Sequence, residues 1–258
     1  MNTKILSNRA FDVIHQYKNF TIGTSIISIP YFNNKVARSR GTFRTYIGKG
    51  SPKDIFEEID SILKKDHFPI EKLTNETLKK LLVDKNIGVD CSGFAYYVLN
   101  AESHELNKGP IDKHLSFVNC KGLLSKMRCS LRPIENCDVG TFANDKNSLT
   151  ISIKDMKPGD MIIMTGDQED TERDHILVIH QIDYQNFVPI KIYYSHSVAY
   201  PEDGIMGTGI RQGSIEILNN QKTIVEQRWT ENNIEGDNNR LFIRAKKSKT
   251  ELRRLKWF

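Results

Sequence analysis

The feature that most constrains the fold is a series of short, strand-like segments in the second half of the chain. Runs rich in Ile, Val and Tyr are separated by polar or glycine-containing turns, which is typical of strands that follow one another in a sheet. These runs cover residues 160–164, 175–183, 189–195, 214–218 and 241–244. Because short turns join consecutive strands in antiparallel pairs, the sequence predicts a mainly antiparallel sheet.

Helical patterns come first in the chain. Ser51 is a predicted helix N-cap followed by Pro52, and apolar residues then recur on one face between residues 55 and 63. A second short helix is predicted around residues 78–82, and a long, partly helical insertion over residues 103–150, where polar residues dominate. Helices followed by consecutive strands indicate the α+β class.

The composition is that of an ordinary folded domain. The chain has 258 residues, of which 38% are hydrophobic and 27% are charged, so disordered and fibrous classes are excluded. The apolar segment 20–29 falls far short of the ~20 residues that a membrane span needs. Polar and charged residues interrupt the first 18 positions, so we identify no secretory signal and expect a cytoplasmic location.

The net charge of +5 is concentrated at the end of the chain. Residues 244–258 contain seven Lys or Arg and a single Glu, which leaves the first 243 residues close to neutral. The overall basicity therefore does not predict a sequence-specific nucleic-acid surface. We expect residues 247–258 to be a solvated basic tail, with a weak contact to an anionic surface as the alternative.

One cysteine occupies a position that favours reactivity. Cys91 follows a loop and begins an apolar helix. The unpaired N–H groups and the positive end of the helix dipole are expected to stabilise a thiolate there, which lowers the pKa of Cys91. The same N–H groups could hold a developing oxyanion. The alternative is that Cys91 is simply a small, buried apolar residue.

Two histidines follow on neighbouring predicted strands. A Lys-Pro-Gly-Asp turn at 157–160 leads into the first strand, and His175 begins the next one, where its ring could act as a base at the sheet edge. His196 lies one strand later. Antiparallel pairing brings these strands side by side, so His196 is expected to hydrogen-bond the far ring nitrogen of His175 and fix its tautomer.

The order of these motifs resembles the NlpC family of papain-like cysteine peptidases, the bacterial cell-wall hydrolases. That order is Asp-Cys-Ser-Gly-Phe at 90–94, the Lys-Pro-Gly-Asp turn, His-x-x-x-Ile at His175, and a third polar residue, here His196. The resemblance covers about residues 87–246. It implies a papain-like, NlpC-type α+β fold in which the cysteine helix packs on a mainly antiparallel sheet.

The resemblance also implies a role for each motif residue. Cys91 would be the nucleophile, His175 the base and His196 the orienting partner. Asp90 and Ser92 fall where the family contacts the amino end of a peptide substrate. Many members also carry a tyrosine shortly before the cysteine motif, whereas residues 73–89 of this chain contain none.

On this basis we expect three parts: an accessory segment at 1–85, a peptidase domain at 86–246 that contains the insertion, and the basic tail at 247–258. The expected function is hydrolysis of an amide bond in peptidoglycan stem peptides, between γ-D-glutamate and a diamino acid, with no metal or organic cofactor. Two alternatives remain open. The same thiol chemistry could serve another amide or an acyl transfer, or the fold could be a binding module that does not catalyse.

The remaining candidates have structural interpretations. Cys120, Cys129 and Cys137 are expected to be reduced thiols, because their spacings suit neither a metal site nor a unique set of disulfides. His180 lies five positions after His175, so in a strand it points to the opposite face, where packing or solvent contact is expected.

Overall fold

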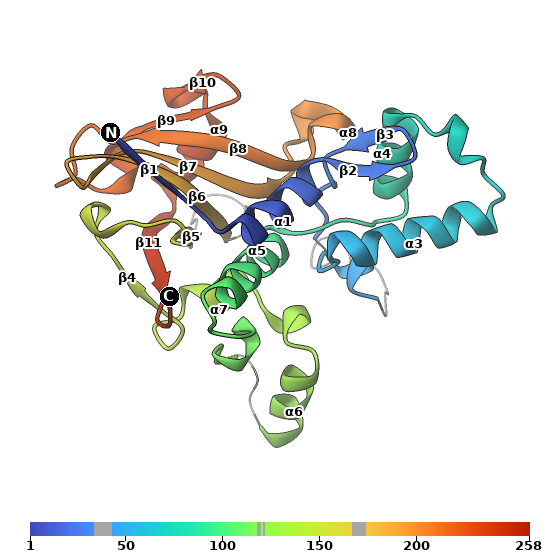
Figure 1. The fold of residues 1–258 in the computed structure, drawn as a ribbon, viewed down its shortest axis with the longest axis horizontal. Helices are drawn as coiled ribbons and strands as arrows, with labels where there is room; N and C mark the ends of the chain where they lie inside the picture. Colours follow the sequence, from blue (N-terminus) through green and yellow to red (C-terminus); the bar gives the residue numbers. More distant parts are fainter. Residues whose placement is uncertain (34–42, 118–119, 121, 167–173) are drawn as a thin grey trace.

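The structure is a computed structural model that describes residues 1–33, 43–117, 120, 122–166 and 174–258 (Figure 1). In chain order the α-helices are α1 (Asn8–Lys18), α3 (Pro52–Lys65), α4 (Asn75–Asp84), α5 (Cys91–Glu105), α6 (Leu123–Leu131), α7 (Val139–Ala143), α8 (Gly204–Gly207) and α9 (Arg240–Lys247). The strands are β1 (Asn2–Ile5), β2 (Phe20–Ile22), β3 (Ser25–Ile27), β4 (Ser148–Thr150), β5 (Met161–Thr165), β6 (His175–Gln185), β7 (Val188–Val198), β8 (Gly209–Glu216), β9 (Arg228–Glu231), β10 (Ile234–Glu235) and β11 (Lys249–Leu255).

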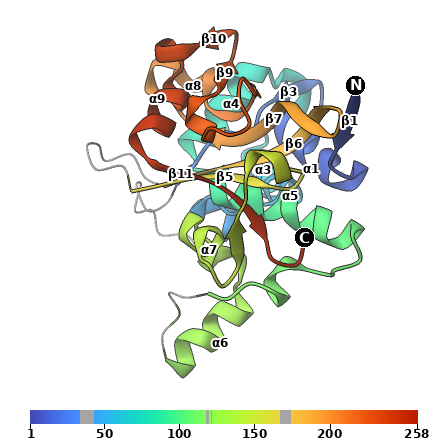
Figure 2. The ribbon, with the colours of Figure 1, turned by 90° about the vertical axis from the view of Figure 1, so that its left-hand side faces the viewer.

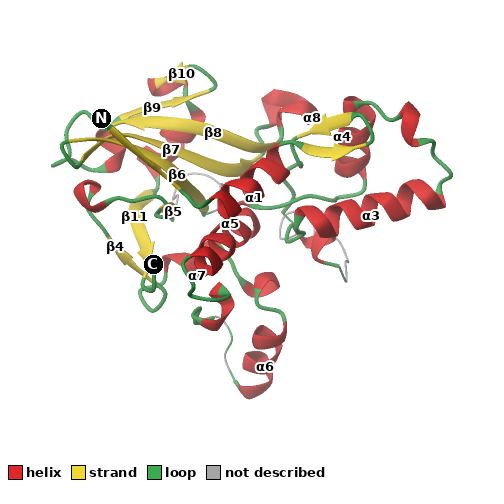
Figure 3. Cartoon of the chain, in the orientation of Figure 1, coloured by secondary structure: helices red, strands yellow, loops and turns green. Residues whose placement is uncertain are grey.

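An antiparallel sheet forms the centre of the fold (Figure 3). Within the described residues it has nine strands in the order β10-β9-β8-β7-β6-β5-β11-β4, and β1 pairs with the second half of β6. Strands β2 and β3 form a separate hairpin. Strands β5, β6 and β7 match three of the predicted strand segments at slightly different bounds, whereas β8 overlaps only residues 214–216 of the fourth. The predicted α+β class with a mainly antiparallel sheet is confirmed.

Apolar side chains cover both faces of this sheet, because buried strands alternate their side chains between the two faces. In β6, Ile176 and Val178 belong to the core that contains α1 and α5. Leu177 and Ile179 belong to the core on the other face, which contains Leu241 of α9. The sheet therefore lies between α5 and α9 (Figure 2).

Residues 1–85 contribute to the same core as the cysteine helix. Ile14 of α1, Ile55 of α3 and Leu78 of α4 are fully buried in one cluster with Phe94 of α5. The predicted helix start at Ser51 is confirmed, because its side chain accepts a hydrogen bond from the backbone of Asp54 in a reciprocal capping box. The division into an accessory segment and a peptidase domain at residue 86 stays a prediction.

The predicted strand at 241–244 is wrong, because these residues lie within helix α9. The side chain of Asn239 caps the first turn by accepting from the backbone N–H of Phe242. Leu241 and Ala245, four positions apart, are the buried residues of the helix. A run of four residues rich in apolar side chains does not distinguish a strand from one turn of helix.

The end of the chain is an internal strand of the sheet, which corrects its interpretation as a solvated tail. β11 pairs with β5 on one side and β4 on the other. Leu252 and Leu255 are buried, and the buried guanidinium of Arg253 donates hydrogen bonds to Ser148. Two consecutive arginines separate these leucines, which pack on opposite faces of the sheet, so the sequence shows no alternation of apolar and polar residues that would predict a strand. Contact of this segment with an anionic surface stays a prediction.

A disulfide joins Cys120 and Cys129, which corrects the expectation of reduced thiols at both positions. Cys120 precedes α6 and Cys129 lies within it, and their Cα atoms are 6.5 Å apart, which is within the range for a disulfide. Cys91 and Cys137 are free and buried. In Figure 1, α6 extends away from the sheet at the lower end of the molecule. Across the described residues, no helix has both the length and the apolar character to cross a bilayer.

Candidate active site

Cys91 is the first residue of α5, where the sequence predicts it. Asp90 is the N-cap of this helix, and its Oδ1 accepts a hydrogen bond of 2.6 Å from the backbone N–H of Gly93. A Cβ atom at Gly93 would lie 2.7 Å from the carbonyl oxygen of Gly48. The motif therefore requires glycine here, because only glycine allows the segment at Gly48 to approach the helix so closely.

Three segments hold the loop that leads into Cys91. The backbone N–H of Val89 donates to the carbonyl of Pro30 at 3.1 Å, and that of Asp90 donates to Gly48 at 2.8 Å. The hydroxyl of Ser197, on β7, donates to the carbonyl of Val89 at 2.8 Å. The start of the cysteine helix is thereby fixed both to the N-terminal segment and to the strand that carries His196.

The two predicted histidines are in contact. His175 is the first residue of β6, and its Nε2 atom lies 2.8 Å from Nδ1 of His196 on β7. Both rings are buried, at 2% and 0% exposure. The register places His175 diagonally across from His196 on neighbouring strands, which is within reach of ring side chains.

The thiol of Cys91 lies at the beginning of β6. Its sulfur is in hydrogen-bond contact with the backbone of Ile176, the residue that follows His175. The structure therefore brings the cysteine of α5 to the strand end that carries the predicted base.

The pKa of Cys91 differs from its prediction. Burial raises the pKa of this thiol to about 11, and the negative charge of Asp90 acts in the same direction. The charges of Arg244 and Lys49 and the hydrogen bond at Ile176 lower it, but they do not outweigh burial. The expectation of a lowered pKa is therefore wrong for this structure, because the loss of solvation exceeds the effect of the helix N-terminus.

Burial also keeps His175 neutral. It lowers the pKa of this imidazole well below the usual value of 6.5, and the charge of Arg244 and the neighbouring ring of His196 add to the effect. At neutral pH the two groups therefore rest as a thiol and a neutral imidazole.

Asp90 and Ser92 share a buried cluster with a lysine that the sequence patterns do not reveal. The Nζ atom of Lys49 lies 2.9 Å from Oδ1 of Asp90, 2.6 Å from Oγ of Ser92 and 2.8 Å from the carbonyl oxygen of Cys137. The hydroxyl of Ser92 donates to the same Oδ1 at 3.0 Å. All three N–H bonds of the ammonium thus have an acceptor.

Two further residues near Cys91 come from distant parts of the chain. Tyr31 forms a parallel β-bridge with Val89, and burial followed by the charge of Cys91 raises the pKa of its phenol. A tyrosine therefore lies beside the cysteine motif, but it comes 60 positions earlier in the sequence. Arg244, on α9, is close enough for its charge to affect the pKa of both Cys91 and His175. The local sequence pattern predicts neither the position of Tyr31 nor that of Arg244 near Cys91.

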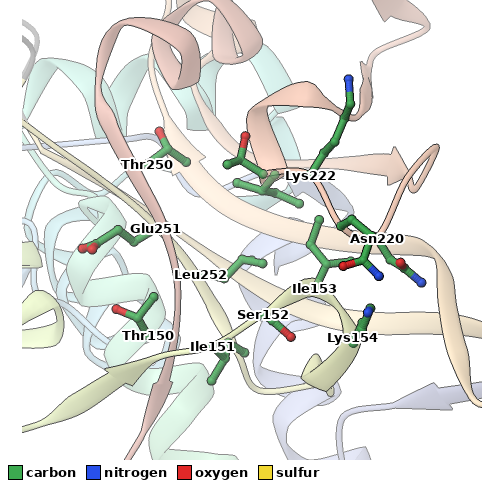
Figure 4. A pocket seen from close by; sticks show the side chains of 13 residues that line it. Thr150, Ile151, Ser152, Ile153, Lys154, Asn220, Lys222, Thr250, Glu251 and Leu252 are labelled. Atoms are coloured by element: carbon green, nitrogen blue, oxygen red, sulfur yellow. The ribbon is translucent and has the colours of Figure 1, made fainter.

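A surface pocket of about 370 Å³ lies between β4, β11 and residues 220–224 (Figure 4). Among the described residues that line it there is no cysteine or histidine, so it lacks a nucleophile with a matching base. In the part of the chain that the structure describes, no three His, Cys, Asp or Glu side chains are grouped as metal ligands.

A cysteine that begins a helix, placed against the start of a histidine-bearing strand in an antiparallel sheet, defines a class of papain-like α+β proteins. Compared with known families, residues 79–233 match the NlpC/P60 family. Since the match covers more than half of the chain, this protein belongs to the NlpC/P60 family. Comparisons with curated proteins and with solved structures found no match. Members of the family are generally cysteine peptidases, and membership implies peptidase or amidase activity on peptidoglycan-type peptides.

Proposed function

We propose that this protein is a cysteine peptidase that hydrolyses an amide bond in peptidoglycan stem peptides, between γ-D-glutamate and a diamino acid. In this proposal Cys91 is the nucleophile, His175 the general base and His196 the group that orients it. The observation that carries the proposal is the meeting of α5 and β6, where the Cys91 sulfur contacts the backbone next to His175.

The reaction begins from a neutral pair, because burial disfavours the charged form of both groups. His175 takes the proton from the thiol as the sulfur attacks the carbonyl carbon of the substrate. The backbone N–H groups of Cys91 and Ser92 have no acceptor within the helix, so they can stabilise the oxyanion that forms.

The tetrahedral intermediate then collapses. Protonated His175 gives its proton to the leaving amine, which departs and leaves a thioester on Cys91. Water, activated by His175, hydrolyses the thioester and restores the thiol. The net change is one amide and one water converted to a carboxylic acid and an amine, with no other reactant.

The test is to incubate the purified protein with a panel of muropeptides and to identify the products by mass spectrometry. We expect a single new cleavage, after γ-D-glutamate, in the wild type. Cys91→Ala and His175→Ala should each abolish it, whereas His196→Ala should weaken it, because an orienting group does not itself transfer the proton.

His104→Ala is a matched control, since this histidine lies on the cysteine helix but at its other end. Full cleavage by Cys91→Ala would rule out the thiol mechanism. Cleavage at another bond would leave the mechanism in place and correct the substrate. Transfer of the acyl group to an added amine, in preference to water, would identify the alternative acyltransferase.

A further inference from the structure

A buried carboxylate lies behind the histidine pair. Glu231, at the end of β9, is 5% exposed, and its Oε2 atom lies 2.8 Å from Nε2 of His196. The hydroxyl of Tyr194 donates to the same oxygen at 3.3 Å. The second oxygen, Oε1, lies 3.7 Å from the guanidinium of Arg211. Glu231, His196 and His175 therefore form a chain of hydrogen-bond contacts in that order.

Glu231 is ionised at neutral pH. Burial alone would raise the pKa of its carboxyl, but the interaction with His196, which includes a hydrogen bond, and the charge of Arg211 outweigh burial and lower that pKa. An ionised carboxylate only accepts hydrogen bonds. The hydrogen of the contact with His196 must therefore be on Nε2 of the imidazole.

The position of the proton on His196 determines its position on His175. When His196 is neutral and carries its proton on Nε2, its Nδ1 is bare and can only accept. The Nε2 atom of His175, 2.8 Å away, must then be the donor. His175 is left with an unprotonated Nδ1, the one ring nitrogen that can take a proton from a thiol.

We propose that Glu231 is a positioning residue that sets the tautomers of His196 and His175, so that His175 presents Nδ1 as the base. The inference rests on the proposed function of Cys91 and His175. When Nδ1 receives the thiol proton, the proton on Nε2 of His175 can move to Nδ1 of His196. The positive charge then lies one hydrogen bond from the carboxylate, which stabilises it.

The decisive experiment is nitrogen-15 NMR of the imidazole rings in protein labelled at histidine, at pH 7.5 and without substrate. In the wild type we expect His175 to carry its proton on Nε2. Glu231→Gln offers a side-chain amide that can also donate, so we expect a mixture of tautomers at His175. Glu231→Asp keeps the carboxylate and should restore part of the wild-type spectrum.

Kinetics on the muropeptide substrate provide the second measurement. Glu231→Gln should lower kcat by about 10- to 100-fold, as is usual for a group that orients a reacting side chain, and leave KM nearly unchanged. Glu235→Gln is the matched control, because this glutamate lies on neighbouring β10 and is exposed. It should change neither kcat nor the spectrum.

A wild-type His175 with its proton on Nδ1 would overturn the proposal, and this result requires no variant to fold. So would a Glu231→Gln protein with unchanged kcat and an unchanged His175 tautomer. Failure of the proposed function looks different. Cys91→Ala would then retain wild-type hydrolysis, while the tautomers of the wild type and Glu231→Gln would still differ.

Discussion

The Nζ atom of Lys49 lies 2.9 Å from Oδ1 of Asp90, and both side chains are buried. Oδ1 also accepts from the hydroxyl of Ser92 and from the backbone N–H of Gly93. One oxygen of the helix N-cap therefore has three donors, of which one comes from the N-terminal segment. Residues outside the cysteine motif thus hold the start of its helix in place.

Replacing Lys49 with Met should destabilise the protein strongly. The substitution leaves the carboxylate of Asp90 buried without its counter-ion, which typically costs about 3–5 kcal/mol. The free energy of unfolding, measured by chemical denaturation, should fall by this amount. Lys53→Met is the control, because Lys53 pairs with Glu57 on the exposed face of α3 and should matter little. Equal effects of the two substitutions would show that the buried pair contributes no more than a surface pair.

The same cluster predicts how the enzyme treats the amino end of its substrate. The family resemblance assigns Asp90 and Ser92 to that end, but Lys49 already supplies an ammonium to both. We therefore expect stem peptides with a free amine and with an acylated amine to have similar kcat/KM values. A preference of more than about tenfold, or 1.4 kcal/mol, for the free amine would show that the substrate displaces Lys49.

Alkylation of Cys91 should depend steeply on pH. Burial raises the pKa of its thiol to about 11, so the reactive thiolate is a minor species at neutral pH. The rate of labelling by iodoacetamide should rise about tenfold per pH unit from pH 7 to pH 10. Peptide mass spectrometry separates Cys91 from Cys137, whose pKa burial raises further above its usual value. A labelling rate that is constant above pH 7 would indicate a preformed thiolate.

The final strand should be essential for folding. Leu255 is fully buried where β11 pairs with β4, so Leu255→Ala should cost about 2–5 kcal/mol. Removal of residues 249–258 should abolish the cooperative thermal transition, since β4 loses its partner and β5 loses one of its two. Leu218→Ala, at a 56% exposed position, is the control for the point substitution. A truncated protein that unfolds like the wild type would restore the interpretation as a solvated tail.

Acid should destabilise the protein through His180. This ring is buried, and its Nδ1 atom shares a hydrogen bond of 3.0 Å with the hydroxyl of Ser195. Burial, with a smaller effect of the charge of Lys18, lowers the pKa of His180 from 6.5 to about 4. Between these two values the unfolded chain binds more protons than the folded one. The free energy of unfolding should therefore fall as the pH drops from 6.5 towards 4, by up to about 1.4 kcal/mol per unit.

His180→Gln should reduce this pH dependence, whereas His15→Gln, at an exposed position of α1, should not. Denaturation curves at pH 7 and pH 5 provide the measurement. The remaining slope in His180→Gln is expected to come partly from His175, because burial lowers its pKa in the same direction. Identical slopes in the wild type and His180→Gln would contradict the assignment.

Local order along the chain was sufficient to predict the class of fold and the two elements that carry the candidate site. The helix that starts at Cys91 and the strand that starts at His175 both begin where a turn signal meets an apolar run. The contact of His196 with His175 also follows from sequence, because consecutive antiparallel strands are neighbours. These features depend on residues that are close in sequence or on adjacent strands.

Tertiary structure alone decided the surroundings of these residues. Lys49 and Glu231 reach Asp90 and His196 from 41 and 35 positions away, and no local period predicts such contacts. The pKa of Cys91 shows why this matters: the sequence by itself determined the helix start that favours a thiolate, but the packing around it removed the solvent that a thiolate needs. Charge position can be read from a pattern of residues, whereas desolvation is the sum of everything that packs on a group, and only the complete fold specifies that sum.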